Sequence, residues 1–458
     1  MNEETRHSLR ALLLCCLLVA AGRAQYVEDS IEVPGAWVGS LAYNSQADVV
    51  YGTSEQANGV FAIHCPTNIM FRNLPANYAQ CVVYDSIDNK VYASFGWYGA
   101  ESLRVIDGQN HIIIGSLSVP GANVLAWEPT RDRLYVTCTN QNCVAVVDCV
   151  TDSVIAQIAV GTAPIKLHLN ARHGKLYVQN YDVGSVSVIN LATNQVIKTI
   201  QVGGYPNAGY YASHVDKYYC AGDSAIVVID GMSDSMVARV PIMPGSVHAI
   251  GGNDATDLVL AEDYNGPTVR YSIDARTDTL MSALNVAGVI YSIVCGPSTG
   301  LLYCASRESD SVLVLDPVSA LVVNTLSVGD APFVSLPVRA HGRMYLGHLN
   351  SDKVYVIKDS STGLTEGGEA VRLGRAVLTA SPNPFTQSVV AVWRSPTKGG
   401  DIVRVYAQDG RLVRQARIPA GQNRWVWDGR DDSGAALPPG VYVLEAGSDF
   451  RAKVVKLR

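Results

Sequence analysis

Charged residues, tryptophan and metal-binding spacings are all scarce in this 458-residue chain. Charged side chains make up only 17% of the sequence, and Asp and Glu outnumber Lys and Arg by 41 to 35. This weakly acidic balance argues against a nucleic-acid partner, which requires a concentrated positive patch. No Cys-x-x-Cys and no His-x₃-His spacing occurs, so the sequence carries no zinc signature. We therefore predict a protein without a metal ion or a cofactor.

Long apolar runs are also rare, and the sequence has one near its start, ALLLCCLLVAA at residues 11–21. The run has the length of a secretory signal peptide, and the small residues Gly22 and Ala24 precede Gln25 at a suitable cleavage site. It is too short for a permanent transmembrane helix. We predict a signal peptide over residues 1–24 and an exported protein, secreted or held at the outer-membrane surface. No later run is long and apolar enough to predict a transmembrane helix.

What the chain has in abundance is one motif, repeated eight times. KLYVQNYDVGSVSVINLATNQVIKTIQVG (175–203) recurs at steps of 40 to 44 residues, and a complete copy divides into four short runs rich in Val, Ile, Leu and Tyr. These runs are too short and too β-branched for helices. A sheet that is apolar on both faces must lie between two neighbours, and this period is typical of a β-propeller. The copies are centred on Tyr51, Tyr92, Tyr135, Tyr177, Tyr219, Val259, Tyr303 and Tyr345.

We therefore predict an all-β fold, with an eight-bladed β-propeller over residues 25–359. Seven blades remain the alternative count. The last copy lacks a convincing fourth strand, whereas DSIEVPG (29–35) resembles the strand that ends the other copies. We expect the segment around Ile31 to pair with the strand around Val356 and to close the ring.

A polar residue follows each centre by about a dozen positions, and Ser or Thr usually follows three residues later. Asp or Asn at such a place can accept hydrogen bonds from the backbone of a tight turn. We interpret these residues as structural and not catalytic: Asp107, Asp148, Asn190, Asp230, Asp274, Asp316 and Asp359.

The repeats contain the segments KLYVQN and SVSVINLATNQVIKTIQVG, and glycine-to-proline linkers join them: VGTAP (160–164), VGGYP (202–206) and VGDAP (328–332). In these segments the repeats resemble the YVTN-type β-propeller repeats of bacterial and archaeal surface proteins. The resemblance covers about three quarters of the chain, although seven blades is the commoner number in that family.

The pattern changes after the repeats. Residues 360–375 are rich in small and polar residues and predict a linker. Residues 376–458 carry 12 Lys and Arg against 7 Asp and Glu, and their short alternating strands predict a small immunoglobulin-like (Ig-like) β-sandwich.

Four segments of the tail stand out: ASPNPF (380–385), VYAQDGRLV (405–413), WDGRDDSGAALPPGVYVL (427–444) and RAKVVKLR (451–458). Through these segments the tail resembles the type A sorting domain of type IX secretion and, equally, the Ig-like fold of flagellar hook-capping proteins. The first resemblance implies that the tail contacts the secretion machinery of the outer membrane.

Eight cysteines lie outside the predicted signal peptide. Export would permit disulfides, and Cys138 with Cys143 or Cys295 with Cys304 are close enough along the predicted strands to pair. Buried free thiols are the alternative.

Catalytic groups do not gather in the sequence. His168, His214 and His248 lie near inner strands of three successive repeats, but they do not share one repeat position, so we do not expect them to bind a metal together. A second set shares the position seven residues before the centre, where a lactonase-like propeller could hold a metal and where turn residues also occur. We interpret this set as turn residues: Asn44, Asp85, Glu128 and Asn170. A quinone-dependent alcohol dehydrogenase would need tryptophan motifs in most blades, but only six tryptophans are present.

We therefore predict a non-enzymatic binding scaffold for a protein or glycan ligand. An extracellular lactonase-like hydrolase that uses the propeller channel and a structural surface-layer component are the alternatives. Aromatic residues in the loops and linkers of one face suit ligand contact. The candidate ligand-binding residues are Trp97, Tyr98, Tyr181, Tyr205, Tyr264 and Phe333.

Overall fold

A computed structural model gives the structure of the chain, and its backbone divides into two compact units after Thr362. The predicted signal peptide lies outside the described residues, as do residues 361–375 of the predicted linker. The structure describes residues 25–457 except 34, 36, 55–58, 76–77, 96–102, 244–246, 264–268, 286–287, 361–377, 382–384, 394–400, 408–410, 420–421, 423 and 447–449.

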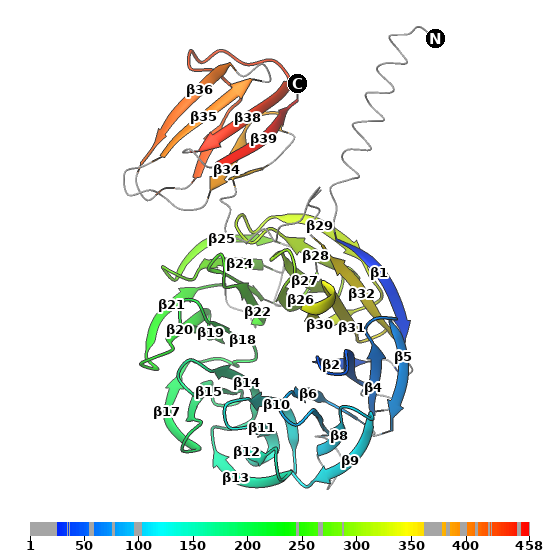
Figure 1. Ribbon diagram of the computed structural model, residues 1–458. Coiled ribbons are helices and arrows are strands. Elements are labelled where there is room, and N and C mark those ends of the chain that lie inside the picture. Colours follow the sequence, from blue (N-terminus) through cyan, green and yellow to red (C-terminus); the bar gives the residue numbers. More distant parts are fainter. Residues whose placement is uncertain are drawn as a thin grey trace. The chain divides into compact units, whose positions relative to one another are not determined.

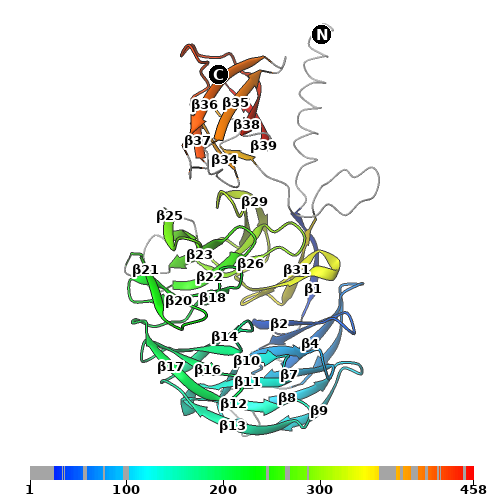
Figure 2. The same cartoon turned by 60° about the vertical axis from the view of Figure 1, so that its left-hand side comes forward.

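Eight four-stranded antiparallel sheets form the first unit and stand as blades around a ring (Figures 1 and 2). Within each blade the four strands lie side by side, with the innermost strand near the axis of the ring and the last at its outer edge. Blades one to four are β2 (Val38–Asn44), β3 (Val49–Ser54), β4 (Gly59–His64) and β5 (Ile69–Leu74); β6 (Cys81–Asp85), β7 (Lys90–Ser94), β8 (Leu103–Asp107) and β9 (Ile112–Leu117); β10 (Ala122–Glu128), β11 (Arg133–Cys138), β12 (Cys143–Asp148) and β13 (Ser153–Ala159); and β14 (Pro164–Asn170), β15 (Lys175–Asn180), β16 (Ser185–Asn190) and β17 (Gln195–Gln201).

The remaining blades repeat this order. Blades five to seven are β18 (Gly209–Ala212), β19 (Lys217–Gly222), β20 (Ala225–Asp230) and β21 (Met236–Pro241); β22 (Val247–Asn253), β23 (Leu258–Asp263), β24 (Val269–Asp274) and β25 (Thr279–Asn285); and β26 (Ile290–Cys295), β27 (Leu302–Ser306), β28 (Ser311–Leu315) and β29 (Val322–Ser327). Blade eight is β30 (Pro332–Val338), β31 (Arg343–His348), β32 (Lys353–Asp359) and, as its outer strand, β1 (Gln25–Glu32). Two 3₁₀ turns, η1 (Thr139–Gln141) and η2 (Arg339–His341), complete the ring.

The prediction of eight blades, rather than seven, is confirmed, and so is the closure of the ring. Strand β1 pairs antiparallel with β32, and Ile31 lies opposite Val354. A bidentate ion pair ties β1 to β31, since Nε and Nη2 of Arg343 donate to the two carboxylate oxygens of Glu28 at 2.6 and 2.7 Å. The first and last parts of the chain therefore share one sheet.

The blades stack because their middle strands are apolar on both faces. Strands β15 and β16 are buried along their whole length apart from their last residue, Asn190. The aromatic residues at the repeat centres are fully buried between neighbouring blades, for example Tyr135 and Tyr303. Burial of this kind on both faces of every sheet is what drives the ring to close on itself.

Hydrogen bonds also join each blade to the next. The hydroxyl of Tyr92 donates to Oδ1 of Asp152 at 2.6 Å, and the acceptor lies in the turn between the third and fourth strands of the following blade. Each acceptor of this kind has positive φ, a conformation that Asp and Asn tolerate better than most residues. The same bond links Tyr135 to Asn194, Tyr177 to Asp234, Tyr219 to Asp278 and, across the closing seam, Tyr345 to Asn68.

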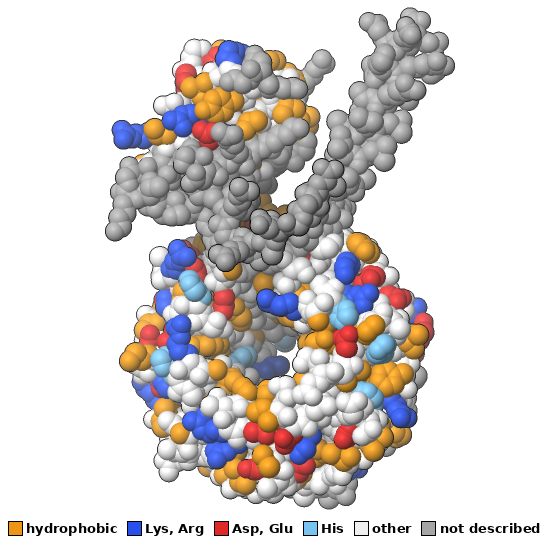
Figure 3. Space-filling model, in the orientation of Figure 1, with side chains coloured by type: hydrophobic (Ala, Val, Ile, Leu, Met, Phe, Trp, Pro, Cys, Tyr) orange, Lys and Arg blue, Asp and Glu red, His pale blue; other side chains and the backbone are white. Residues whose placement is uncertain are grey.

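The antiparallel order gives the ring two different faces. The turns between the first and second strands, and between the third and fourth, lie on one face, which we call the turn face. The loops between the second and third strands, and the linkers between blades, lie on the opposite face, which we call the loop face. A hollow is visible at the centre of the ring in Figure 3, and charges of both signs are interspersed on the side shown.

The second unit is a two-sheet sandwich, which confirms the predicted Ig-like fold. One sheet has the order β33 (Leu378–Ser381), β34 (Val389–Trp393) and β37 (Arg424–Trp427). The other has the order β36 (Leu412–Ile418), β35 (Asp401–Ala407), β38 (Gly440–Ala446) and β39 (Phe450–Lys456). Trp427 is buried at its centre, between the rings of Phe385 and Tyr442. Across the part of the chain that the structure describes, no helix is both long and apolar enough to span a membrane.

Candidate functional site

Two of the predicted ligand-binding aromatics form a pair on the loop face. Tyr181 follows β15 in a loop between the second and third strands of blade four, and Tyr205 lies in the linker that leads to blade five. Their ring centroids are 5.1 Å apart. Tyr205 is 63% exposed, so the pair offers a large ring surface to a ligand.

A second group, which we call the aromatic row, crosses three successive inner strands. His248, Tyr291 and Phe333 are each the second residue of an inner strand, in β22, β26 and β30, and therefore lie at the loop-face end. The ring of Tyr291 lies 5.8 Å from that of His248 and 5.2 Å from that of Phe333. All three side chains are partly exposed. The row therefore spans blades six, seven and eight with one surface of half-buried rings.

A cation accompanies this row. The guanidinium of Arg307 lies 5.7 Å from the ring centroid of Tyr291, and its Nη1 donates to the Tyr291 hydroxyl at 3.3 Å. Arg307 is exposed in the loop between β27 and β28. Burial lowers the pKa of His248, so its imidazole is neutral at pH 7. The site thus combines one exposed positive charge with three neutral rings.

The sequence predicted Phe333 but missed its partners in the row. His248, Tyr291 and Phe333 lie 11 or 12 residues before the centres of their repeats, so their shared register was a usable signal. The predicted ligand-binding residues Trp97, Tyr98 and Tyr264 lie outside the described residues.

The three histidines considered as a metal set occupy three different environments. His168 packs against the ring of Tyr218, and burial lowers its pKa to about 3. His214 pairs through Nδ1 with Asp257 at 2.7 Å on the turn face. His248 belongs to the aromatic row. The described residues therefore do not bring these imidazoles to one site.

The polar residues that follow the repeat centres lie in the turns between third and fourth strands. Oδ1 of Asp148 accepts from the backbone N–H of Thr151 at 2.9 Å, and Oδ1 of Asp230 from that of Ser233 at 2.8 Å. These hydrogen bonds lower the pKa of both carboxyl groups. The same type of bond forms at Asp107, Asn190, Asp274 and Asp316.

Asp359 departs from this pattern and corrects the prediction for that residue. It ends β32, whose outer neighbour is β1 and not a fourth strand that follows along the chain. Its buried carboxylate instead joins blade eight to blade seven. It accepts from the backbone N–H of Ser298 at 2.8 Å and from the hydroxyl groups of Thr299 and Tyr303 at 2.6 and 2.8 Å. Asp359 therefore has a structural role, but it joins two blades and does not close a turn between strands.

The set that precedes the repeat centres by seven residues also lies in turns. Asn44, Asp85, Glu128 and Asn170 are buried at the turn-face ends of the inner strands. Each accepts a hydrogen bond from a backbone N–H two or three residues later. Their side chains therefore organise turns and do not line the channel.

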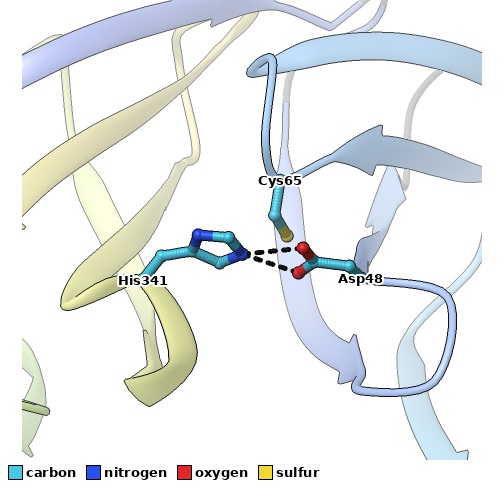
Figure 4. Close-up of side chains that lie close together, drawn as sticks. All are labelled: Asp48, Cys65 and His341. Atoms are coloured by element: carbon cyan, nitrogen blue, oxygen red, sulfur yellow. Dashed lines mark hydrogen bonds and ion pairs between the residues drawn. The ribbon is translucent and has the colours of Figure 1, made fainter.

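Two groups of metal-ligating side chains occur among the described residues, both at seams between blades on the turn face. Asp48, Cys65 and His341 bring together a carboxylate, a thiol and an imidazole (Figure 4). Asp85, Asp132 and Cys149 form the second group, and all three are buried.

All eight cysteines of the described chain are free thiols, six of them buried. Cys138 and Cys143 lie directly opposite one another on β11 and β12, unbonded. Burial raises the pKa of Cys138 to about 12, and the adjacent Cys143 adds to this rise. Such thiols are poor nucleophiles at neutral pH.

The turn face also holds a recess of about 530 Å³ between blades one and two. Phe71 meets the ring of His111 edge-on at its wall, with centroids 4.9 Å apart. The lining has no Lys, Arg, Asp or Glu, so it suits a neutral polar molecule better than an ion. The lining residues are Gln46, Ala47, Val49, His64, Thr67, Ile69, Phe71, Gln109 and His111.

Known proteins resemble each unit separately. Residues 399–449 match the FlgD Ig-like domain family. The uncharacterized protein YncE of Salmonella typhi is 26% identical over 163 residues, which are 35% of this chain and 46% of that protein. Its counterpart in Salmonella typhimurium strain LT2 matches to the same extent. The chain thus spans about half the length of these relatives.

Solved propellers share the fold at low identity. The Dos1 propeller aligns with a TM-score of 0.61 at 11% identity, over 74% of this chain and 96% of that chain. A chain of Kuenenia stuttgartiensis hydrazine synthase aligns with a TM-score of 0.51 at 15% identity, over 72% and 96%. These likenesses support the predicted propeller, and at such identities they speak for its fold alone.

Proposed function

We propose that this protein is an exported, non-enzymatic binding scaffold that presents the loop face of its propeller to a protein or glycan ligand. The observation that carries this proposal is the aromatic row of His248, Tyr291 and Phe333, with Arg307 over its middle ring. Three rings in matching positions on three rigid strands form a continuous contact surface.

The chemistry of the row suits recognition. Aromatic rings bury large apolar area at small cost in conformational entropy, and they stack on sugar rings or on apolar side chains. Arg307 adds a planar cation that can bind carboxylates of an acidic ligand. Because the rings stand on inner strands, the surface is preformed and loses little freedom on binding.

The carboxylates of the ring favour binding over hydrolysis. A lactonase-like site needs carboxylates that converge at the mouth of the channel. Among the described residues, the one metal-ligating group with two carboxylates contains Asp85 and Asp132, and these are buried in a seam between blades. This position gives a substrate no access to them.

We further propose that the chain is exported through a signal peptide at residues 1–24 and that its Ig-like domain acts as the sorting module toward an outer-membrane secretion machinery. The match of residues 399–449 to the FlgD Ig-like domain supports the fold of such a module. Expression of the full chain and of a chain ending at residue 360, each in a bacterium with type IX secretion, tests this part. Equal amounts of both in the medium would contradict it.

Ligand binding is tested with the full chain on glycan arrays and in pull-downs with surface proteins. Tyr291→Ala and Phe333→Ala are expected to weaken binding at least about tenfold, and Tyr205→Ala to weaken it if the Tyr181 pair belongs to the same site. Tyr26→Ala is the matched control, because Tyr26 is 51% exposed but lies on the outer strand β1. Equal loss in all variants would contradict a site on the loop face.

Exposed aliphatic residues favour a second candidate, a surface component that self-associates. Ile112, Ile113 and Ile114 begin the outer strand β9 and are 46, 38 and 50% exposed. The outer strands of other blades carry similar residues, so apolar side chains surround much of the ring. Analytical ultracentrifugation distinguishes the two, because a binding scaffold stays monomeric where a structural component forms concentration-dependent assemblies. Exposed aliphatic residues on the other outer strands include Ile69, Val154, Ile155, Ile197, Val237, Leu280, Val322 and Val323.

A further inference from the structure

A carboxylate, a thiol and an imidazole meet where the first and last blades of the ring join. Asp48 lies in the turn between β2 and β3, and Cys65 follows β4 in the same blade. His341 ends η2 in blade eight and points toward both (Figure 4). Its Nε2 lies 2.7 and 2.9 Å from the two carboxylate oxygens of Asp48. The ligand atoms of all three residues lie within 4.8 Å of one another.

The surrounding structure holds this group in place. The backbone N–H of Cys65 donates to the carbonyl oxygen of Asp48 at 3.0 Å, and the hydroxyl of Tyr43 donates to Oδ1 of Asp48 at 2.8 Å. Nη1 of Arg343 donates to the carbonyl oxygen of Cys65 at 2.7 Å. Nε2 of His341 binds the same carboxylate, so both Tyr43 and His341 fix the orientation of Asp48. The three side chains are therefore oriented before any ligand arrives.

We propose that Asp48, Cys65 and His341 bind a zinc ion that links blade one to blade eight. Sulfur, nitrogen and oxygen ligands of this kind are those that zinc prefers, and zinc takes four ligands in a tetrahedron. The side chains of Asp48 and His341 are 33 and 24% exposed, so water can reach the group and supply the fourth ligand. Binding displaces the thiol proton of Cys65 and also the Nε2 proton that His341 shares with Asp48. The imidazole then coordinates through the lone pair of Nε2, as a neutral ring with its proton on Nδ1.

The seam between blades four and five has the same imidazole–carboxylate pair, but it has glycine in the place of the thiol. His173 pairs with Asp216 at 2.6 Å between blades four and five, in the same places of the repeat as His341 and Asp48. In that seam Gly231 occupies the position equivalent to Cys65. The imidazole–carboxylate pair alone is thus a recurrent bridge between blades, whereas the closing seam adds the softer ligand that selects zinc.

The second group of ligating side chains has no histidine and is fully buried. Cys149 occupies the repeat place of Cys65, and the backbone of Asp132 accepts from it just as that of Asp48 does from Cys65. The third member there is Asp85 and not a histidine, and all three residues are buried. An ion would reach this group only if the seam opened. Cys149 and His173 therefore provide matched controls for Cys65 and His341.

The zinc ligands are distant in sequence, which explains why no zinc spacing marks them. His341 is 293 residues from Asp48. An ion held between them would stabilise the closure of the ring, since any ligand that binds only the folded state raises its stability.

The test uses the full chain, freed of metal and titrated with Co²⁺, which takes zinc sites and gives visible absorption bands. We expect one equivalent of Co²⁺ to produce tetrahedral d–d bands with a thiolate charge-transfer band, Zn²⁺ to displace it, and Zn²⁺ to raise the unfolding temperature. Cys65→Ser and His341→Gln are expected to abolish the thiolate band, and Cys149→Ser and His173→Gln to retain it.

The proposal is overturned if the folded wild-type chain gives no thiolate band, or if the band survives Cys65→Ser. It is also overturned if Cys149→Ser removes the band, since the ion would then belong to the buried group between blades two and three. Circular dichroism confirms that each variant is folded. If Cys65→Ser does not fold, His341→Gln decides alone, because its side chain lies at the surface of the seam and its loss leaves the core intact.

Discussion

Asp85 and Asp132 approach one another across the seam between blades two and three, and each has one buried carboxylate oxygen, Oδ2, without a hydrogen-bond partner. Burial raises the pKa of Asp85 to about 6, and the charge of Asp132 contributes to the rise. At the same place in blade one stands Asn44, whose Nδ2 donates to Oδ1 of Asn89 in the next blade at 2.9 Å. The amide of Asn44 thus makes a hydrogen bond across its seam, whereas at the equivalent seam the two carboxyl groups leave buried oxygens without a partner.

We therefore predict that Asp85→Asn stabilises the protein at neutral pH. In the wild type Asp85 is protonated in the folded state up to about pH 6, whereas in the unfolded chain it ionises near pH 4. Between these two pH values the folded state binds one more proton than the unfolded state. The free energy of unfolding therefore falls as the pH rises from about 4 to about 6. Above pH 6 it stays lower, by up to about 3 kcal/mol. Urea unfolding at pH 4.5 and pH 8 measures the effect, and the gain of the variant is expected to be larger at pH 8.

Asp148→Asn is the matched control for this prediction. The pKa of Asp148 is lowered by hydrogen bonds from the backbone and side chain of Thr151, which is the opposite of Asp85. The same chemical change is therefore expected to destabilise the protein at pH 8. A stabilisation by both variants would show that the gain at Asp85 does not come from its buried charge.

The tyrosine bonds between blades give a second prediction. The hydroxyl of Tyr219 donates to Oδ1 of Asp278 at 2.6 Å, and Nζ of Lys217 binds the other oxygen at 2.7 Å. Tyr219→Phe removes the hydroxyl without changing the packing, and Lys217 still satisfies the carboxylate in part. We expect a loss of about 1–2 kcal/mol in the free energy of unfolding, measured by urea denaturation. Tyr205→Phe, at an exposed position, is expected to have no effect.

The ion pair of blade six gives a third prediction. Nε of Arg270 lies 2.7 Å from Oε1 of Glu262 on the adjacent strand, and both side chains are almost completely buried. Arg270→Met leaves a buried carboxylate without its partner and is expected to cost about 3–5 kcal/mol. The double variant Arg270→Met, Glu262→Met removes both charges and is expected to recover most of that loss. Equal stability of the single and double variants would show that the unpaired carboxylate of Glu262 is not the cause of the loss.

The repeat made the ring predictable from the sequence, since both the blade number and the pairing of β1 follow from counting copies and from a strand missing in the last one. The bonds between blades carried a signal that was missed. Turns that receive a tyrosine hydroxyl have Asp, Asn or His at the position of positive φ, but the turn of blade seven has Ala320 there. The preceding blade has Val259 where the others have tyrosine. The donor and its acceptor are thus replaced together, which marks them as partners.

The groups at the seams could not be predicted in the same way. The approach of His341 to Asp48 and Cys65 depends on which turns of blades eight and one come together, and this needs the rotation between neighbouring sheets. A period in the sequence does not contain that angle. The aromatic row could be predicted only in part. The shared repeat position of its residues is visible in the sequence, whereas the contact of Tyr291 with Arg307 depends on the conformation of a loop.

Ring closure gives the last prediction. Ile31 is 5% exposed on β1 and packs in the core of the closing seam with Val354 and Val356, so Ile31→Ala is expected to cost about 2–4 kcal/mol of unfolding free energy. Ile69 is the matched control, because it also lies on an outer strand but is 59% exposed, and Ile69→Ala is expected to change stability by less than about 0.5 kcal/mol. Urea denaturation measures both, and limited proteolysis of the Ile31 variant is expected to cut first near β1, since this strand is held only at the outer edge of blade eight. Equal stability of the two variants would mean that the pairing of β1 with β32 contributes little to holding the ring closed.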